Sequence, residues 1–102
     1  MSFYVINAVR RDPDSGEVTH VRWGMADPQA NGWSARLVDA SAEDVIDAIE
    51  AGDTVTTHHA VAGGHISGRN VRVEVQANGV EVLRSADSDD PKLQGLEDLP
   101  TF

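Results

Sequence analysis

The sequence contains no cysteine, only one lysine and no apolar run long enough to cross a membrane. Without cysteine there are no disulfides and no thiolate metal ligands, which fits a reducing compartment such as the cytoplasm. A membrane span needs about 20 apolar residues in a row, and no window approaches that length. The first residues also lack the basic region and apolar core of a signal peptide. We therefore expect a soluble, cytoplasmic protein without a membrane partner.

The charge is strongly unbalanced, with 17 acidic against 8 basic residues and a formal net charge of -9. Such a charge repels phosphate backbones, so nucleic acid is disfavoured as a partner. The acids Glu43, Asp44, Asp47 and Glu50 fall in one segment, whereas all seven arginines lie in or beside segments predicted to be strands. We expect an acidic helix side and a sheet side that is richer in arginine.

One helix is predicted, over residues 41–53. Its apolar residues recur at i, i+3, i+4 and i+7, the spacing of a single helix face: Ala42, Val45, Ile46 and Ile49. Ser41 with Asp44 three residues later predicts an N-cap, and Gly52 suits the left-handed residue that follows a helix. The apolar stripe covers about one third of the helix, which suits packing on a sheet.

Short β-type runs separated by turn residues surround this helix, at 3–11, 17–23, 33–39, 53–59, 70–76 and 80–84. The pair Asn78-Gly79 is typical of a two-residue hairpin turn. That turn would place Leu83 with Arg72 and Gln76, on the face opposite the valines of the hairpin. The pattern predicts an α+β fold: a five- or six-strand, mostly antiparallel sheet with one helix packed on one face.

The segment 85–102 is an acidic tail with three regularly spaced leucines. It holds five acids and one base, Lys92, and a disordered tail would not need Leu93, Leu96 and Leu99. We expect the leucines to dock back on the body through a loose or 3₁₀ turn. The chain, residues 1–102, is then a single domain.

The order of these motifs resembles a family of small uncharacterised bacterial domains. The matching pieces are EVTHV at 17–21, AIEAGD at 48–53, VLRS at 82–85 and LQGLEDLP at 93–100. The resemblance implies a small α+β domain with the Leu-Pro segment packed against it, and it implies no activity. The chain departs from the pattern in a longer Gly- and His-bearing loop, residues 58–69.

Histidines are the one set of metal or acid/base candidates. A zinc site without cysteine uses imidazoles or carboxylates, so a small metal-dependent or His-using enzyme would draw on His58, His59 or His65. Adjacent strand residues point to opposite faces, however, and His58 and His59 cannot easily bind one ion together. No cofactor motif is present, and we expect no cofactor.

A binding role follows from the small size of the helix. A helix of about ten residues spans only about 15 Å, which leaves part of the sheet, or its second face, uncovered. Arg and Trp are enriched at protein interfaces. We therefore expect a non-enzymatic module that binds a protein partner or itself through Arg72, Gln76, Leu83, Trp23 and Trp33, with the histidine enzyme as the alternative.

Overall fold

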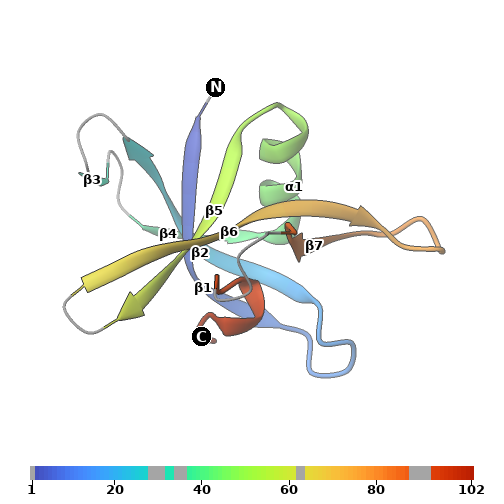
Figure 1. Cartoon of the computed structure of the whole chain (residues 1–102). Coiled ribbons are helices and arrows are strands. Elements are labelled where there is room, and N and C mark those ends of the chain that lie inside the picture. Colours follow the sequence, from blue (N-terminus) through green and yellow to red (C-terminus); the bar gives the residue numbers. More distant parts are fainter. Residues whose placement is uncertain (1, 28–31, 34–36, 62–63, 88–92) are drawn as a thin grey trace.

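The computed structural model describes residues 2–27, 32–33, 37–61, 64–87 and 93–102. Within these residues, seven strands and one α-helix form an α+β fold, which confirms the predicted class (Figure 1). The elements, in chain order, are β1 Phe3–Arg11, β2 Val18–Asp27, β3 Gly32–Trp33, β4 Val38–Ser41, α1 Ala42–Glu50, β5 Thr54–Val61, β6 Gly64–Val75, β7 Glu81–Ser85 and the 3₁₀ turn η1 Leu96–Asp98.

The strands form one mixed sheet in the order β3-β2-β1-β5-β6-β7, and β4 also pairs with β2. All pairs are antiparallel except β1 with β5, which run parallel because the chain returns to the sheet through α1. β1 is central, and its buried residues Val5, Ile6, Ala8 and Val9 belong to both faces. Both faces of the sheet therefore carry apolar side chains that have to be covered.

The helix covers one of these faces. Ser41 caps it as the sequence predicts, since its Oγ accepts from the Asp44 amide and the Asp44 carboxylate accepts from the Ser41 amide. Gly52 has φ +98°, the left-handed conformation expected after a helix. Val45 and Ile46 are buried in the same core cluster as Ile6, Val21 and Val55.

The β6–β7 hairpin has a register one residue away from the predicted one. Val73 pairs with Leu83, because the loop has three residues, 77–79, and the Gln76 amide donates to the Val80 carbonyl at 2.8 Å. Gly79, at φ +85°, supplies the left-handed position of this loop. The shift turns Leu83 into the core, where it is 2% exposed, so the prediction of an exposed Leu83 is wrong.

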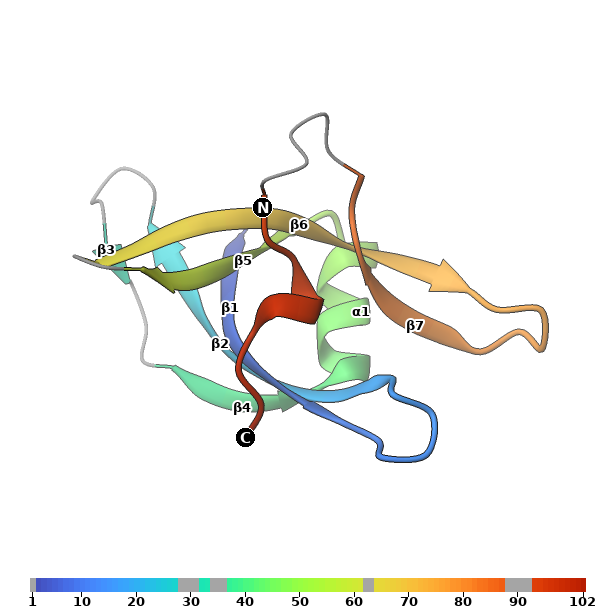
Figure 2. The same ribbon diagram turned by 60° about the horizontal axis from the view of Figure 1, so that its bottom comes forward.

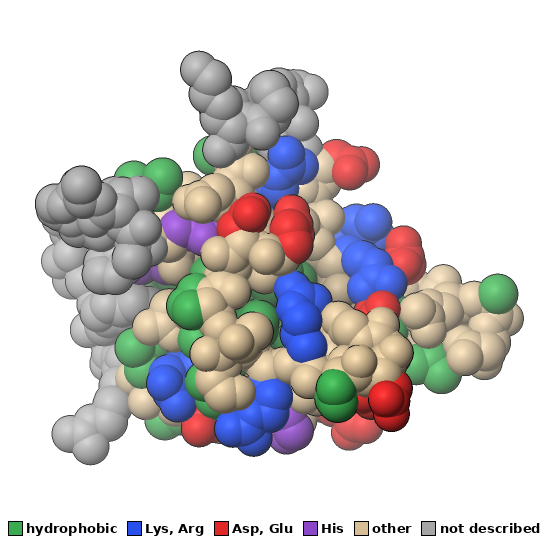
Figure 3. Space-filling view, turned by 90° about the horizontal axis from the view of Figure 1, so that it is seen from below, with side chains coloured by type: hydrophobic (Ala, Val, Ile, Leu, Met, Phe, Trp, Pro, Cys, Tyr) green, Lys and Arg blue, Asp and Glu red, His purple; other side chains and the backbone are tan. Residues whose placement is uncertain are grey.

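The C-terminal segment pairs beside β1 at Val9, and its buried leucines join the same core cluster as α1. Leu96 and Leu99 are buried, Leu93 is half-buried, and Thr101 forms a parallel bridge with Val9 where β5 no longer pairs with β1. Figure 2 shows this segment in front of the sheet, and Figure 3 shows several Arg side chains on the face seen from below. Arg10, Arg11 and Arg69 contact this segment, whereas Arg72 stays exposed on β6.

The predicted loop at 58–69 is mostly strand. β5 and β6 form a hairpin in which His58 pairs with Ser67 and His59 with Ile66. A Cβ at position 68 would meet the Gln94 carbonyl, the His59 ring and the Thr57 hydroxyl, so Gly68 allows the tail to cross closely over β6. Glycine here serves close approach within a strand and not a flexible loop.

Candidate functional site

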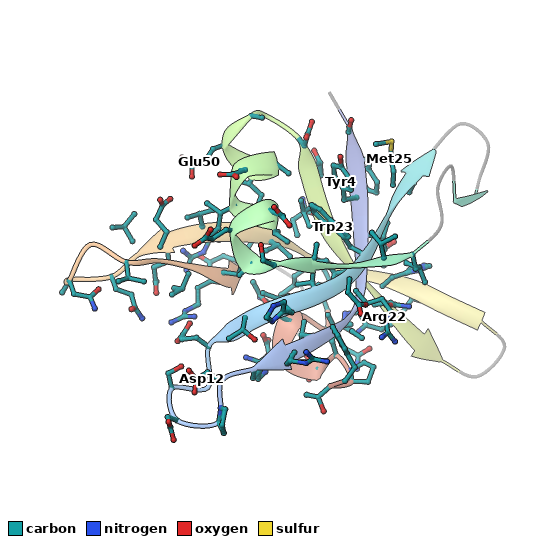
Figure 4. All side chains as sticks on the ribbon, turned by 180° about the vertical axis from the view of Figure 1, so that it is seen from behind. Tyr4, Asp12, Arg22, Trp23, Met25 and Glu50 are labelled. Carbon is teal, nitrogen blue, oxygen red and sulfur yellow. The ribbon has the colours of Figure 1, made fainter. Side chains whose placement is uncertain are left out.

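The residues predicted to bind a partner do not form one surface. Leu83 is in the core, and Trp23 is 8% exposed, with its ring stacked on Tyr4 at 4.3 Å between centroids. Figure 4 shows Trp23 next to the helix, with Tyr4 behind it and Met25 farther from the helix. Arg72 is exposed on the outer face of β6 and pairs with Glu74 at 3.6 Å. Trp33 pairs with Ala26 at the sheet edge, and its side chain lies outside the described residues.

Three arginines hold the C-terminal segment in place. Arg10 donates to the Phe102 carbonyl at 3.1 Å, Arg11 to the Leu96 carbonyl at 3.0 Å, and Arg69 to the Leu93 carbonyl at 3.0 Å. Arg10 and Arg22 also lie over the Phe102 ring, at 4.8 and 4.5 Å from its centroid. These guanidinium groups are engaged within the molecule, which argues against a partner site beside this segment.

Of the histidine candidates, His58 and His59 occupy adjacent positions of β5, which point to opposite faces. His59 is 3% exposed, and its Nε2 lies 2.9 Å from the Thr57 hydroxyl, which itself donates to the Arg69 carbonyl. Burial lowers the pKa of His59, while Asp98, Glu97 and the Gln94 backbone act in the opposite direction. His58 is half-buried on the neighbouring position of β5, and the side chain of His65 lies outside the described residues.

No group of three or more His, Asp or Glu side chains is placed to hold a metal ion within the part of the chain that the structure describes. The buried His59 fits a structural role, because its ring nitrogen already has a hydrogen-bond partner. The geometry thus gives the enzyme alternative no support from the described residues.

A cleft lies between two hairpins of the described structure. It has a volume of about 490 Å³ and is lined by three segments: 12–20 from the β1–β2 hairpin, 41–46 from the start of α1, and 76–82 from the β6–β7 hairpin. We call it the inter-hairpin cleft. Figure 2 shows the two hairpins extending on the same side of the molecule, with α1 between them. Gln76 is the one residue predicted to bind, among those whose side chains are described, that lines it.

One wall of the cleft is the unpaired edge of β7. Hydrogen-bonded pairs alternate along antiparallel strands, and both Gln76–Val80 and Asn70–Ala86 are such pairs. Glu81, Leu83 and Ser85 therefore direct their backbone N–H and C=O groups away from β6. Among the described strands, none pairs with β7 on that side. An edge with free backbone donors and acceptors is a template for another strand.

The opposite wall comes from the start of β2. β4 pairs with β2 only from His20 to Trp23, because the chain enters α1 directly after Ser41. Val18 and Thr19 line the cleft beyond the end of that pairing. The sheet is thus open between β2 and β7, and the gap is spanned by the Arg84–Glu17 ion pair.

This ion pair is bidentate, with Arg84 Nη1 2.6 Å and Nη2 3.0 Å from the two Glu17 carboxylate oxygens. Arg84 Nε is also 3.2 Å from Glu74. The Arg84 guanidinium, chiefly by hydrogen bonding, lowers the pKa of Glu17, and Glu17 raises that of Arg84. The pair therefore fixes the distance between the two hairpins at the base of the cleft.

The floor and rim of the cleft differ in character. Its floor is apolar, with Val18, Ala42, Ile46 and Val82, while Glu43 and Glu81 stand at the rim. Val80 lines the cleft and is 51% exposed. Apolar lining beside free strand-edge groups is the combination that extended peptides use when they bind by strand addition. Sequence reasoning missed this site because it depends on the long-range placement of two hairpins.

Comparisons of the chain with protein-family models, with curated proteins and with solved structures give no match. The resemblance to a family of small bacterial domains therefore stays a prediction. In the described part of the chain, no helix is long and apolar enough to cross a membrane. The function has to be argued from the site alone.

Proposed function

We propose that the protein is a non-enzymatic, cytoplasmic binding module that takes an extended segment of a partner protein into the inter-hairpin cleft. The segment adds a strand to β7. The observation that carries the proposal is the open edge of β7, which faces a cleft of about 490 Å³ instead of another strand.

Two further features support strand addition at this place. The backbone N–H and C=O of Glu81 and the N–H of Leu83 point outward and make no hydrogen bond to β6. Ser85 is already contacted by the C-terminal segment, because the Leu96 amide donates to Ser85 Oγ at 2.8 Å. The available edge therefore ends at residue 83. The apolar floor offers contacts to alternate side chains of an added strand, while the backbone bonds supply the register.

The test uses proline at an edge position. Proline is tolerated on an edge strand when its missing N–H would point away from the sheet, so Glu81→Pro removes one binding donor and leaves the β6–β7 bonds intact. Glu81→Ala is the matched control, because it removes the same carboxylate and keeps the N–H. Circular dichroism and thermal melts establish that both variants fold.

The probes are 12-residue peptides selected on the wild-type protein from a phage-displayed random library. We expect their amide footprint, measured by NMR, to fall on 17–20 and 76–83, and Glu81→Pro to bind about tenfold more weakly than Glu81→Ala, as the loss of one buried hydrogen bond implies. Equal affinity for the two variants, a footprint elsewhere, or failure to enrich any peptide would overturn the proposal.

A further inference from the structure

A second hollow adjoins the inter-hairpin cleft, and its chemistry restricts the partner. It has a volume of about 330 Å³ and lies between one flank of α1 and the start of β7. We call it the acidic hollow. It shares Glu43, Ile46, Val80 and Glu81 with the cleft and adds Asp47 and Glu50. A strand added to β7 would pass along it.

Four carboxylates surround an apolar floor in this hollow. Glu43, Asp47 and Glu50 follow one another at i, i+4 and i+7 on the helix, and Glu81 faces them from β7. Figure 4 shows Glu50 on the side of the helix that is turned toward the β6–β7 hairpin. Neither Lys nor Arg is among the residues that line the hollow.

The described arginines are engaged elsewhere. Arg84 and Arg72 pair with Glu17 and Glu74, Arg22 pairs with Asp39 at 2.9 Å, and the other three hold the C-terminal segment. Within the described ranges, no ion pair involves any of the four carboxylates of the hollow. The molecule places negative charge here without neutralising it from its own described side chains.

Two features of the hollow are electrostatically unfavourable for the Glu50 carboxylate. Glu50 and Glu81 both line the hollow, and hydrogen bonding and charge repulsion from the Glu81 carboxyl raise the pKa of Glu50. Glu50 is also the last residue of α1, at the negative end of the helix dipole, and the last turn has no basic residue. A cation from outside would relieve both.

The spacing of the carboxylates indicates that basic side chains, and not a metal ion, would supply this positive charge. No three of the described carboxylates converge as metal ligands do. Residues 43–50 extend for about 10 Å along the helix at 1.5 Å per residue. Side chains on one face of an added strand repeat at about 6.8 Å, so two basic side chains two residues apart fall within that length.

We infer that the bound segment is basic, with Lys or Arg at alternate positions of a strand lying along β7 and facing the helix flank Glu43, Asp47 and Glu50. The inference rests on the proposed strand addition. A second copy of this chain is a poorer occupant, because its net charge is also -9.

The test uses three acetylated, amidated octapeptides with alternating valine: one with two lysines two residues apart in the middle, one with threonine there, and one with glutamate. Affinities are measured by isothermal titration calorimetry at low and at physiological salt. We expect the lysine peptide to bind at least about tenfold tighter than the threonine peptide, and the glutamate peptide to bind most weakly.

Site-specificity is tested with neutral isosteres. The triple variant Glu43→Gln, Asp47→Asn, Glu50→Gln should remove most of the preference for lysine over threonine, because those residues are exposed and their change leaves the strand edge intact. Asp87→Asn is the control: it is exposed, lies outside both lining sets and should keep the preference.

The outcomes separate the two proposals. If the threonine peptide binds as tightly as the lysine peptide and Glu81→Pro weakens both, strand addition stands and the basic partner is refuted. If the lysine preference falls equally in Asp87→Asn and in the triple variant, the attraction is general and the inference is again refuted. If Glu81→Pro weakens neither peptide, or if light scattering shows a dimer that masks the β7 edge, strand addition itself fails.

Discussion

Truncating Leu96 to alanine tests whether the C-terminal segment is part of the core. Leu96 is 3% exposed and belongs to the same buried cluster as Val9, Val18 and Leu83. Its backbone is also fixed, since its amide donates to Ser85 Oγ and its carbonyl accepts from Arg11. The side chain is therefore held in place, and we expect little collapse into the space it leaves.

The magnitude follows from the atoms removed. Leu96→Ala deletes three carbon atoms, worth about 2.4 kcal/mol at about 0.8 kcal/mol each, and the remaining cavity brings the range to about 2–5 kcal/mol. For a domain of this size, each kcal/mol lowers the melting temperature by about 4–8 °C. Leu96→Ala should therefore melt at least about 8 °C below the wild type.

Urea unfolding at neutral pH, followed by tryptophan fluorescence, measures the free energy directly. Leu93→Ala is the matched control, because it removes the same atoms from a half-buried position and should cost less. A loss below about 0.5 kcal/mol for Leu96→Ala, as at surface sites, would refute the placement of the segment in the core.

Two further predictions concern the crossing of the tail over β5 and β6. Because the pKa of His59 is lowered in the folded protein, the free energy of unfolding keeps its full value above about pH 6.5 and falls as the pH drops below that value. Urea midpoints measured between pH 8 and 5 should therefore fall less for His59→Gln than for wild type or for the exposed control His20→Gln. The same pH dependence of the midpoint in His59→Gln and wild type would contradict this. Gly68→Ala places a methyl group against the Gln94 carbonyl and should lower the free energy of unfolding by about 1–3 kcal/mol in the same assay. The control Ser67→Ala, at the exposed neighbouring position, should change it very little. An unchanged free energy of unfolding in Gly68→Ala would mean that the tail does not lie there.

The helix could be predicted from the sequence because its signals are local. Ser41, Asp44 and Gly52 lie within the helix or directly at its ends, and each occupies the position that its chemistry favours. The stripe of Val45 and Ile46 reports the buried face for the same reason. Local chemistry and the tertiary packing agree in this segment.

The hairpin register could not be predicted in the same way. Asn78-Gly79 suits a two-residue loop, but a three-residue loop also needs a left-handed glycine, and Gly79 serves it equally well. The choice is made by the core, which buries Leu83 at 2% exposure. One residue of shift exchanges the faces of β7, so a small local ambiguity moved a core residue onto the predicted surface.

The inter-hairpin cleft could not be predicted from the sequence for a related reason. Arginine spacing on strands does not reveal that Arg10, Arg11 and Arg69 hold the chain's own C-terminal carbonyls. The cleft is formed by segments around residues 12–20, 41–46 and 76–82, which only the complete topology brings together. Charge and size predicted a binding role, and the location had to come from the structure.

The central position of β1 has a consequence for how the protein is made. Its partners are Val18–Met25 of β2, then Thr54–Thr57 of β5, and finally Thr101, so the first strand is completed by residues up to 92 positions away. Such distant pairing gives a high contact order and slow folding. During synthesis the N-terminal hairpin leaves the ribosome before Thr101 has been made, so Val9 is still exposed. The hairpin therefore stays vulnerable to aggregation until the C-terminal residues have been translated and have paired with β1.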